Sequence, residues 1–412
     1  MIEIKDKKDC CGCHACMSVC AHRAITMQTD AEGFLYPMVD KSLCTDCGMC
    51  ELVCPVIHQS SSAQPLKVYA AKSNDEEVSR QSSSGGIFSL LAEAIIREGG
   101  VVFGAKFDEE WNVVHASTET LDGLAAFRGS KYVQSTIGNT YKEAKEFLKQ
   151  GRKVLFTGTP CQIAGLKRFL RRNYDNLLAV DVICHGVPSP LVWQRYLSGL
   201  QQTLRTKWDV GRNKAFSPLD ALPVITGISF RDKTNGWSKF GFRLSCSVSE
   251  AAFDSAIKER EEFIQPFSQN IYMKGFLGNL YLRPSCHHCP TKEPHEMSDV
   301  TLGDYWGIEK DFPDWNDDKG TSVVIVRSDK GMEYCHEISM KYCPAEFEKI
   351  CKYNPALVSS YRTHRNRERF FSIQGSISSN WIERMLQPTL WERLNNKWYM
   401  IKRKFRTQND SK

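Results

Sequence analysis

The sequence predicts a small α+β domain, then an α/β body with a largely parallel sheet, and finally a helical C-terminal tail. Three observations lead to this fold class. The first 54 residues hold two cysteine runs of identical spacing, separated by two short strand candidates. Between residues 153 and 204, apolar strands alternate with helical segments, as expected for parallel pairing in an α/β layer. After residue 389, apolar side chains recur at helical spacing.

Both N-terminal cysteine runs have the spacing C-x2-C-x2-C-x3-C, and the second run is followed by Pro55. This is the bacterial-type run that binds [4Fe-4S] cubes, with the fourth cysteine ligating the other cluster. The segment between the runs fits two short strands, 24–27 and 34–39, around a turn. We therefore predict a ferredoxin-like two-cluster domain at residues 1–62. Its clusters are assigned to two sets: Cys10, Cys13, Cys16 and Cys54, and Cys44, Cys47, Cys50 and Cys20.

Zinc and disulfides are the alternatives for these cysteines. Structural zinc sites favour separated C-x2-4-C pairs, and disulfides need an oxidising compartment. Met1 to Asp9 is charged rather than apolar, and the sequence has no run of 18 apolar residues. Such a sequence with 17 cysteines predicts a cytoplasmic protein whose thiols serve metals and chemistry. Cys11 lies outside the register and is interpreted as a spare thiol.

Composition is that of an ordinary globular protein, with 42% hydrophobic and 25% charged residues among 412. The net charge of +6 is too diffuse to indicate nucleic-acid binding. A polar run at 59–64 predicts a linker after the first domain. We place the N-terminal part of the body at 66–150, its C-terminal part at 151–355, and a basic tail at 356–412.

The first part of the body begins with a strand at 67–72, and the turn Ser82–Gly86 opens a helix at 87–96. Such a turn offers backbone N–H groups to a phosphate, although serine before a helix is more often only a cap. Further on, the pattern predicts strands at 101–107 and 113–117, a polar loop at 127–135, and a helix at 141–150.

Two strand–cysteine–helix units follow. A buried-type strand at 153–158 leads through Cys161 into a helix at 162–170, and a strand at 177–183 leads through Cys184 to a helix at 192–204. The remaining expectations are antiparallel strands at 225–230 and 240–246, a helical stretch at 253–276 broken at Pro266, strands at 300–302 and 322–327, and helices after residue 333.

A third cysteine constellation combines these two units with Cys286 and Cys289. The C-x2-C pair is half a metal site, and the carboxyl ends of adjacent parallel strands place Cys161 and Cys184 at one sheet edge. The four together suit a third [4Fe-4S] cluster. Zinc with His287 or His288 is an alternative, and so is a core role for Cys161 and Cys184 as small buried residues.

The chain resembles the family of beta subunits of coenzyme F420-reducing hydrogenases and dehydrogenases. Six motifs carry the resemblance and occur in the family's order: Ser82–Gly86, Gly129–Ser135, Thr157–Gln162, Cys184–Gly186, Cys286-x2-Cys289 and Gly303–Gly307. This family includes bacterial members beside exopolysaccharide genes, and we place the chain in that branch. The family binds FAD and an iron–sulfur cluster in its α/β body, so the resemblance implies a flavin-binding body and supports the third cluster.

The resemblance also implies flavin contacts and reacting groups. Lys131 is a candidate positive charge beside the flavin or a solvated loop lysine, and His185 is a candidate proton donor or a structural turn residue. Asp304 either hydrogen-bonds near the site or ends a strand. The full set of expected cofactor contacts is Ser84, Gly85, Gly86, Lys131, Tyr132, Gln134, Ser135, Thr157, Gly158 and Thr159.

These features predict an FAD- and [4Fe-4S]-dependent oxidoreductase acting between a redox protein such as ferredoxin and a small substrate or coenzyme. The alternatives are a non-catalytic electron-transfer subunit of a larger complex and an iron–sulfur sensor. In the tail, basic residues surround an apolar stripe at helical spacing. The stripe suits either packing on the protein body or contact with an anionic membrane surface: Leu390, Leu394, Trp398, Ile401 and Phe405.

Overall fold

The computed structural model describes the chain except for residues 60–63, 212–223, 249–258, 293–296, 373–378 and 389–412. The apolar stripe expected from Leu390 to Phe405 lies outside the described residues, so both interpretations of the tail stay predictions.

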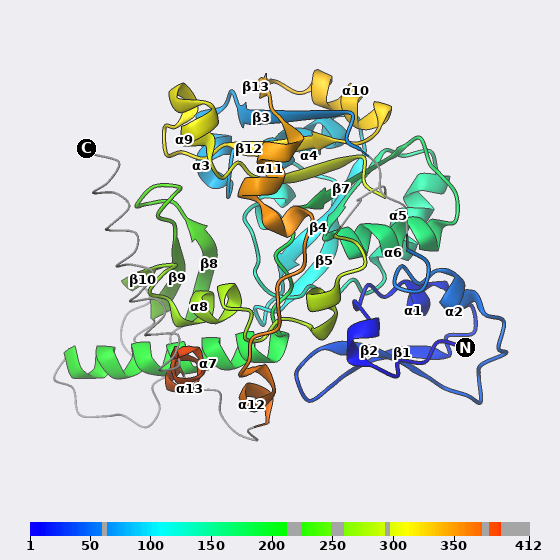
Figure 1. Ribbon diagram of the computed structural model, residues 1–412, viewed down its shortest axis with the longest axis horizontal. Helices are drawn as coiled ribbons and strands as arrows, with labels where there is room; N and C mark the ends of the chain where they lie inside the picture. Colours follow the sequence, from blue (N-terminus) through cyan, green and yellow to red (C-terminus); the bar gives the residue numbers. More distant parts are fainter. Residues whose placement is uncertain (60–63, 212–223, 249–258, 293–296, 373–378, 389–412) are drawn as a thin grey trace, which may run out of the picture.

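The N-terminal residues form a small lobe that lies against α5 (Thr140–Lys149) and α6 (Pro160–Leu170) of the body (Figure 1). Strands β1 and β2 pair antiparallel, with Ile25 opposite Val39, so the two short strands expected here are confirmed. Asp30 shapes their turn, since its carboxylate accepts from the backbone N–H groups of Glu32 and Phe34. The elements are η1 (Lys7–Asp9), α1 (Ala15–Val19), β1 (Ile25–Thr29), β2 (Leu35–Val39) and α2 (Met49–Leu52).

An eight-stranded mixed sheet forms the centre of the body, in the order β13-β3-β12-β11-β7-β6-β4-β5. The neighbours β11, β7, β6 and β4 are parallel, as expected from the alternating strands and helices, whereas β5, β12, β3 and β13 are added antiparallel. The bounds are β3 (Lys67–Ser73), β4 (Val101–Phe107), β5 (Val113–Thr118), β6 (Val154–Gly158), β7 (Leu177–Val182), β11 (Val300–Asp304), β12 (Ser322–Val326) and β13 (Met340–Pro344).

Alternation along the strands gives the sheet two apolar faces. In β6, Phe156 packs with α5 and α6, whereas its neighbour Leu155 packs on the opposite face with α4 and α10. The sheet is therefore buried on both sides, which suits its parallel centre. The covering helices are α3 (Glu76–Gln81), α4 (Ile87–Arg97), α5 (Thr140–Lys149), α6 (Pro160–Leu170), α9 (Ile308–Asp311), α10 (Asp329–Glu337) and α11 (Phe347–Tyr353), with η2 (Asp122–Ala126), η4 (Pro313–Trp315) and η5 (Pro355–Leu357).

A second sheet of three antiparallel strands, β10-β9-β8, packs with α7 and α8 around an aromatic core that includes Trp193, Phe230 and Tyr272 (Figure 1). Its pair β8 and β9 confirms the expected antiparallel strands. The bounds are α7 (Pro190–Gly211), β8 (Val224–Asp232), β9 (Gly241–Val248), β10 (Glu259–Pro266), α8 (Ile271–Leu277), η3 (Pro284–His288), α12 (Arg367–Phe371) and α13 (Ser379–Leu386).

Two helical expectations are wrong. Residues 259–266 form strand β10, because they complete a sheet edge beside β9, and the helix α8 begins only at Ile271. Residues 340–344 form strand β13, which pairs with β3 within the region expected to be entirely helical. In both segments pairing with a neighbouring strand overrides local helical preference.

Candidate metal centres and flavin site

The two N-terminal cysteine runs share one backbone geometry. Gly12 and Asp46 occupy equivalent positions and have positive φ angles of 69° and 52°. His14 and Gly48 form the next equivalent pair, at 62° and 73°. Left-handed residues in such loops turn successive backbone N–H groups into a concave nest, a geometry that recurs at iron–sulfur sites. Each run is therefore shaped to surround an anionic group, and both fit a cluster.

The structure places the cysteines of the two runs in two groups. One cavity is lined by Cys20 together with Cys44, Cys47 and Cys50, the set assigned to one cluster. Around the other set, burial and the neighbouring Cys10 and Cys54 together raise the pKa of Cys16 to about 12. A cysteine with such a pKa is a neutral thiol at neutral pH, and a bound metal would stabilise the thiolate that serves as its ligand.

Cys161, Cys184, Cys286 and Cys289 line a single cavity. Cys161 lies in the first turn of α6 and Cys184 follows β7, so the carboxyl ends of two parallel neighbours bring them together. Cys286 lies in η3 and Cys289 caps it. A tetrathiolate set with this burial fits a [4Fe-4S] cube.

The electrostatics of this cavity favour a positively charged occupant. Burial raises the pKa of Cys184 to about 12, while the Lys292 ammonium lowers it. Burial also raises the pKa of Cys286. Hydrogen-bond partners already lie next to the sulfurs: Thr159 Oγ1 at 3.2 Å from Cys161 Sγ, and the Val187 N–H at 3.4 Å from Cys286 Sγ. Such contacts around the ligands adjust the potential of a bound cluster.

The zinc alternative for this cavity gains little from the neighbouring histidines. His287 does not line the cavity, and its Nδ1 hydrogen-bonds the backbone carbonyl of Tyr361 at 2.9 Å. His288 is exposed. Among the described residues, no group of three or more His, Cys, Asp or Glu side chains is arranged to hold a single metal ion.

Cys11 is not an isolated spare thiol. It is buried and lines the third cavity, and the neighbouring Cys13 and Cys161 both influence the pKa of its thiol, so it lies close to the two. It therefore lies between a predicted ligand of an N-terminal cluster and a predicted ligand of the third. The sequence register could not show this contact, because it depends on how the lobe packs against α6.

The loops expected to bind flavin meet one another. Ser130 N and Oγ contact Ser83 Oγ at 2.8 and 3.0 Å, which joins the turn 82–86 to the loop 129–135. From this loop, Tyr132 turns toward Arg231, with 3.4 Å between its hydroxyl and Nη1. Ser84 is engaged by the body, since its Oγ donates to the Thr321 carbonyl at 2.8 Å.

The glycines of the turn have a packing reason of their own. The Gly85 N–H donates to Ser322 Oγ at 2.9 Å, and a Cβ at Gly85 would lie 2.4 Å from the Ala71 carbonyl oxygen. Gly86 caps α4 with a φ of 89°. At Gly85 the backbone therefore approaches β3 and β12, and its N–H is already occupied within the protein.

The remaining expected contacts lie away from this loop junction. Gln134 turns toward the lobe and donates to the Cys11 carbonyl at 3.1 Å. Ser135 Oγ accepts from the Gln162 side chain at 2.9 Å. Thr157 Oγ1 donates to the Phe103 carbonyl at 3.0 Å. Gly158 ends β6, and Thr159 begins α6 beside Cys161.

Lys131 and His185 have different environments. Lys131 Nζ donates to the carbonyls of Ala126 and Arg128, and burial lowers its pKa to about 7, a range that suits proton exchange at neutral pH. His185 lines the third cavity, but its Nε2 bonds Asn279 Oδ1 at 2.8 Å and its ring stacks on Tyr361. Burial lowers the pKa of His185 to about 4, so its ring is neutral at pH 7, which favours the structural interpretation.

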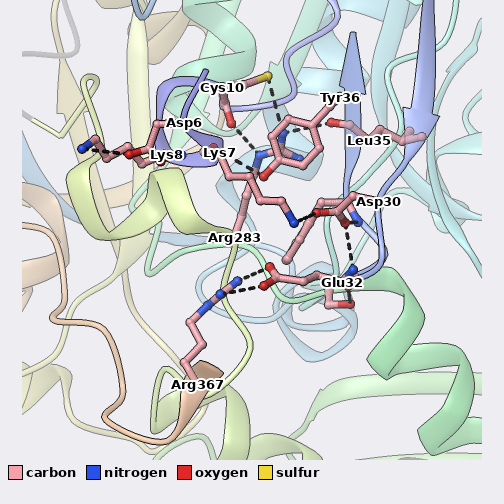
Figure 2. A network of polar contacts seen from close by, with 12 residues as sticks. Asp6, Lys7, Lys8, Cys10, Asp30, Glu32, Leu35, Tyr36, Arg283 and Arg367 are labelled. Carbon is pink, nitrogen blue, oxygen red and sulfur yellow. Dashed lines mark hydrogen bonds and ion pairs between the residues drawn. The ribbon is translucent and has the colours of Figure 1, made fainter. Parts of the chain in front are cut away.

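Four buried or half-buried cations were missed by sequence reasoning. Arg231 forms an ion pair with Asp304 at 2.5 Å, so Asp304 both ends β11 and anchors this arginine. Lys233 Nζ donates to the Ser79 carbonyl at 2.6 Å. Arg283 and Arg367 both reach the N-terminal lobe (Figure 2). In the sequence, these residues stand out only as cations within a predicted strand or just before a cysteine pair. Such cations are too common for their position alone to indicate a functional role.

A dicluster lobe on an α/β body with a third tetracysteine cavity defines an iron–sulfur protein of the oxidoreductase type. The model of a 4Fe-4S dicluster domain matches residues 9–57. Models of the coenzyme F420 hydrogenase/dehydrogenase beta subunit match residues 68–140 with the N-terminal part and 151–348 with the C-terminal part. The chain belongs to the family of coenzyme F420 hydrogenase/dehydrogenase beta subunits, as its motifs predict.

Two curated relatives are archaeal. The chain is 28% identical over 219 residues to a coenzyme F420-dependent sulfite reductase of Methanocaldococcus jannaschii, covering 50% of this chain and 32% of the relative. It is 27% identical over 191 residues to a subunit of the F(420)H(2) dehydrogenase of Methanosarcina mazei, covering 42% and 53%. The matches thus span about half of these relatives or less. The expected exopolysaccharide branch has no support from them.

A chain of the F420-reducing [NiFe] hydrogenase complex from Methanosarcina barkeri superposes with a TM-score of 0.43 at 16% identity, covering 76% of this chain and 93% of that one. None of the helices that the structure describes is both long and apolar enough to cross a membrane.

Proposed function

We propose that this protein passes electrons between a redox partner such as ferredoxin and a small substrate or coenzyme, through three [4Fe-4S] clusters and one FAD. The observation that carries the proposal is the cavity lined by Cys161, Cys184, Cys286 and Cys289, which the buried Cys11 joins to the N-terminal lobe. Clusters exchange single electrons, whereas a flavin stores two and hands over a hydride, so the combination supports conversion between the two kinds of chemistry.

The flavin is proposed at the junction of the loops 82–86 and 129–135. Lys233 supports this position, because burial lowers its pKa to about 8 and its Nζ contacts backbone carbonyls, including that of Ser84 at 3.5 Å. Within the described part of the chain, no carboxylate lies within ion-pair distance of Lys233. A diphosphate beside it would add its negative charge to that of Asp304 and Asp317, which raise the pKa of Lys233 from a greater distance. Lys131, Tyr132 and Ser84 belong to the same junction.

Coenzyme F420 is proposed as the substrate, because the names of both curated relatives contain it. The N-terminal clusters would then take electrons from the protein partner, and the flavin would exchange a hydride with F420. The second candidate function is an electron-transfer subunit without turnover of its own, which the description of one relative as a dehydrogenase subunit favours.

Anaerobic turnover separates the two functions. With reduced ferredoxin as the donor, the purified full chain is expected to reduce F420. The loss of F420 absorbance measures this reduction. Reduced methyl viologen is the control donor, since a small donor reaches a flavin without the clusters. Failure of both donors in protein that holds full iron and FAD would contradict catalysis and favour the electron-transfer subunit.

A further inference from the structure

We propose that Arg283 positions the cluster bound by Cys10 and raises its reduction potential through a buried positive charge. The inference rests on the cluster assignment above. Arg283 immediately precedes η3, which contributes Cys286 to the third cavity, and its guanidinium hydrogen-bonds backbone groups of the N-terminal lobe (Figure 2).

The guanidinium of Arg283 is fully buried, and each of its three nitrogens forms a hydrogen bond. Nε donates to the Cys10 carbonyl at 2.7 Å, and Nη2 lies 3.5 Å from Cys10 Sγ. Nη2 also donates to the Leu35 carbonyl at 2.9 Å, and Nη1 donates to Gln134 Oε1 at 3.0 Å. The guanidinium lies 4.3 Å from the ring centre of Tyr36. These contacts fix its direction toward one predicted cluster ligand.

The buried charge of Arg283 has no carboxylate partner in the part of the chain that the structure describes. Among the residues that the structure describes, Arg283 forms no ion pair with Asp or Glu, and its oxygen partners are neutral carbonyl and amide groups. An uncompensated buried cation is costly, so an anion is expected nearby. Within the described chain, the Cys10 sulfur is the one hydrogen-bond acceptor of Arg283 that can carry negative charge, and a cube ligated by four thiolates would supply that anion.

The cysteine run leaves room for this cation. A Cβ on Gly12 would lie 2.8 Å from Arg283 Nη1 and 3.0 Å from Cζ, so a side chain there would displace the guanidinium. The main chain of Arg283 meanwhile fixes the third site, since its carbonyl accepts from the Cys286 N–H at 2.9 Å. One residue therefore links the surroundings of two predicted clusters.

A second buried arginine provides a matched comparison. Arg367 also joins the body to the lobe, but it pairs with Glu32 at 2.5 and 3.0 Å and donates to the Leu282 carbonyl (Figure 2). None of its contacts within the described chain is with a cysteine. If Arg283 only docks the lobe, its removal should act like the removal of Arg367.

The test is a redox titration of the anaerobically purified full chain, in which electron paramagnetic resonance monitors the reduction of each cluster. Arg283→Gln is expected to keep its iron. The equilibrium constant for reduction of one cluster is expected to fall at least about tenfold, which lowers the reduction potential of that cluster by ~59 mV for a one-electron couple. The reason is that net charge and hydrogen bonds at the sulfurs set cluster potentials. Arg367→Gln is expected to leave every cluster potential unchanged.

Unchanged potentials in Arg283→Gln, or equal shifts in both variants, would overturn the proposal. If Arg283→Gln does not retain its iron, Gly12→Ala is the variant to measure. Its added methyl group displaces the guanidinium from Cys10 and is expected to lower the potential of the same cluster. An unchanged potential in Gly12→Ala would also overturn the proposal. Wild-type protein with fewer than about eight irons would instead contradict the cluster assignment itself.

Discussion

Replacing Cys286 by alanine is expected to lower the iron content of anaerobically purified protein from about twelve to about eight atoms per chain. Cys286 is one of four thiols around a single cavity, and its loss leaves an open corner in the cube. The N-terminal cysteines contribute to other groups and are expected to keep their iron. Iron quantitation together with the optical spectrum measures the change.

The control for this variant is Cys335→Ala. Cys335 is also removed from solvent but lies in α10, outside the cavity, so its replacement should leave about twelve irons. An iron content that is the same in both variants would remove the third cluster from the account.

Replacing Gly85 by alanine is expected to lower the free energy of unfolding by about 1–3 kcal/mol. The new methyl group would lie 2.4 Å from the Ala71 carbonyl oxygen and 2.9 Å from the Ser322 nitrogen, both in backbone that cannot easily move. Urea denaturation followed by tryptophan fluorescence measures this loss. Gly85 thus has a packing role in the protein body, and its expected contact with a cofactor stays a prediction.

Gly199→Ala is the control for that substitution, because Gly199 is exposed in α7 and a Cβ there would have nothing within 4 Å. Alanine at this position should keep or raise stability, since it is the better helix former. If saturating FAD fully restored the stability of Gly85→Ala, the glycine would act through the flavin and the packing argument would be wrong.

The sequence was most informative where spacing alone constrains geometry. The cysteine runs predicted the lobe, because three thiols within seven residues can surround little else than a cluster. Cys161 and Cys184 could be brought together from their positions after consecutive strands, since parallel neighbours β6 and β7 share one edge. Both inferences depend on contacts that the backbone determines locally.

Other features depend on long-range packing and could not be predicted. Strands β10 and β13 exist because a sheet edge was available to each, although their sequences suit helices. Cys11 gained its contact with Cys161 only when the lobe packed against α6. Arg283 is separated by 273 positions from Cys10, so no local pattern connects the two.

The most direct test of the central claim is coulometric reduction of anaerobically purified protein. Three [4Fe-4S] clusters that take one electron each and a flavin that takes two predict uptake of about five electrons per chain, with about twelve irons. Full iron with uptake of about three electrons would contradict the flavin, and about eight irons with uptake of about two electrons would contradict both the flavin and the third cluster.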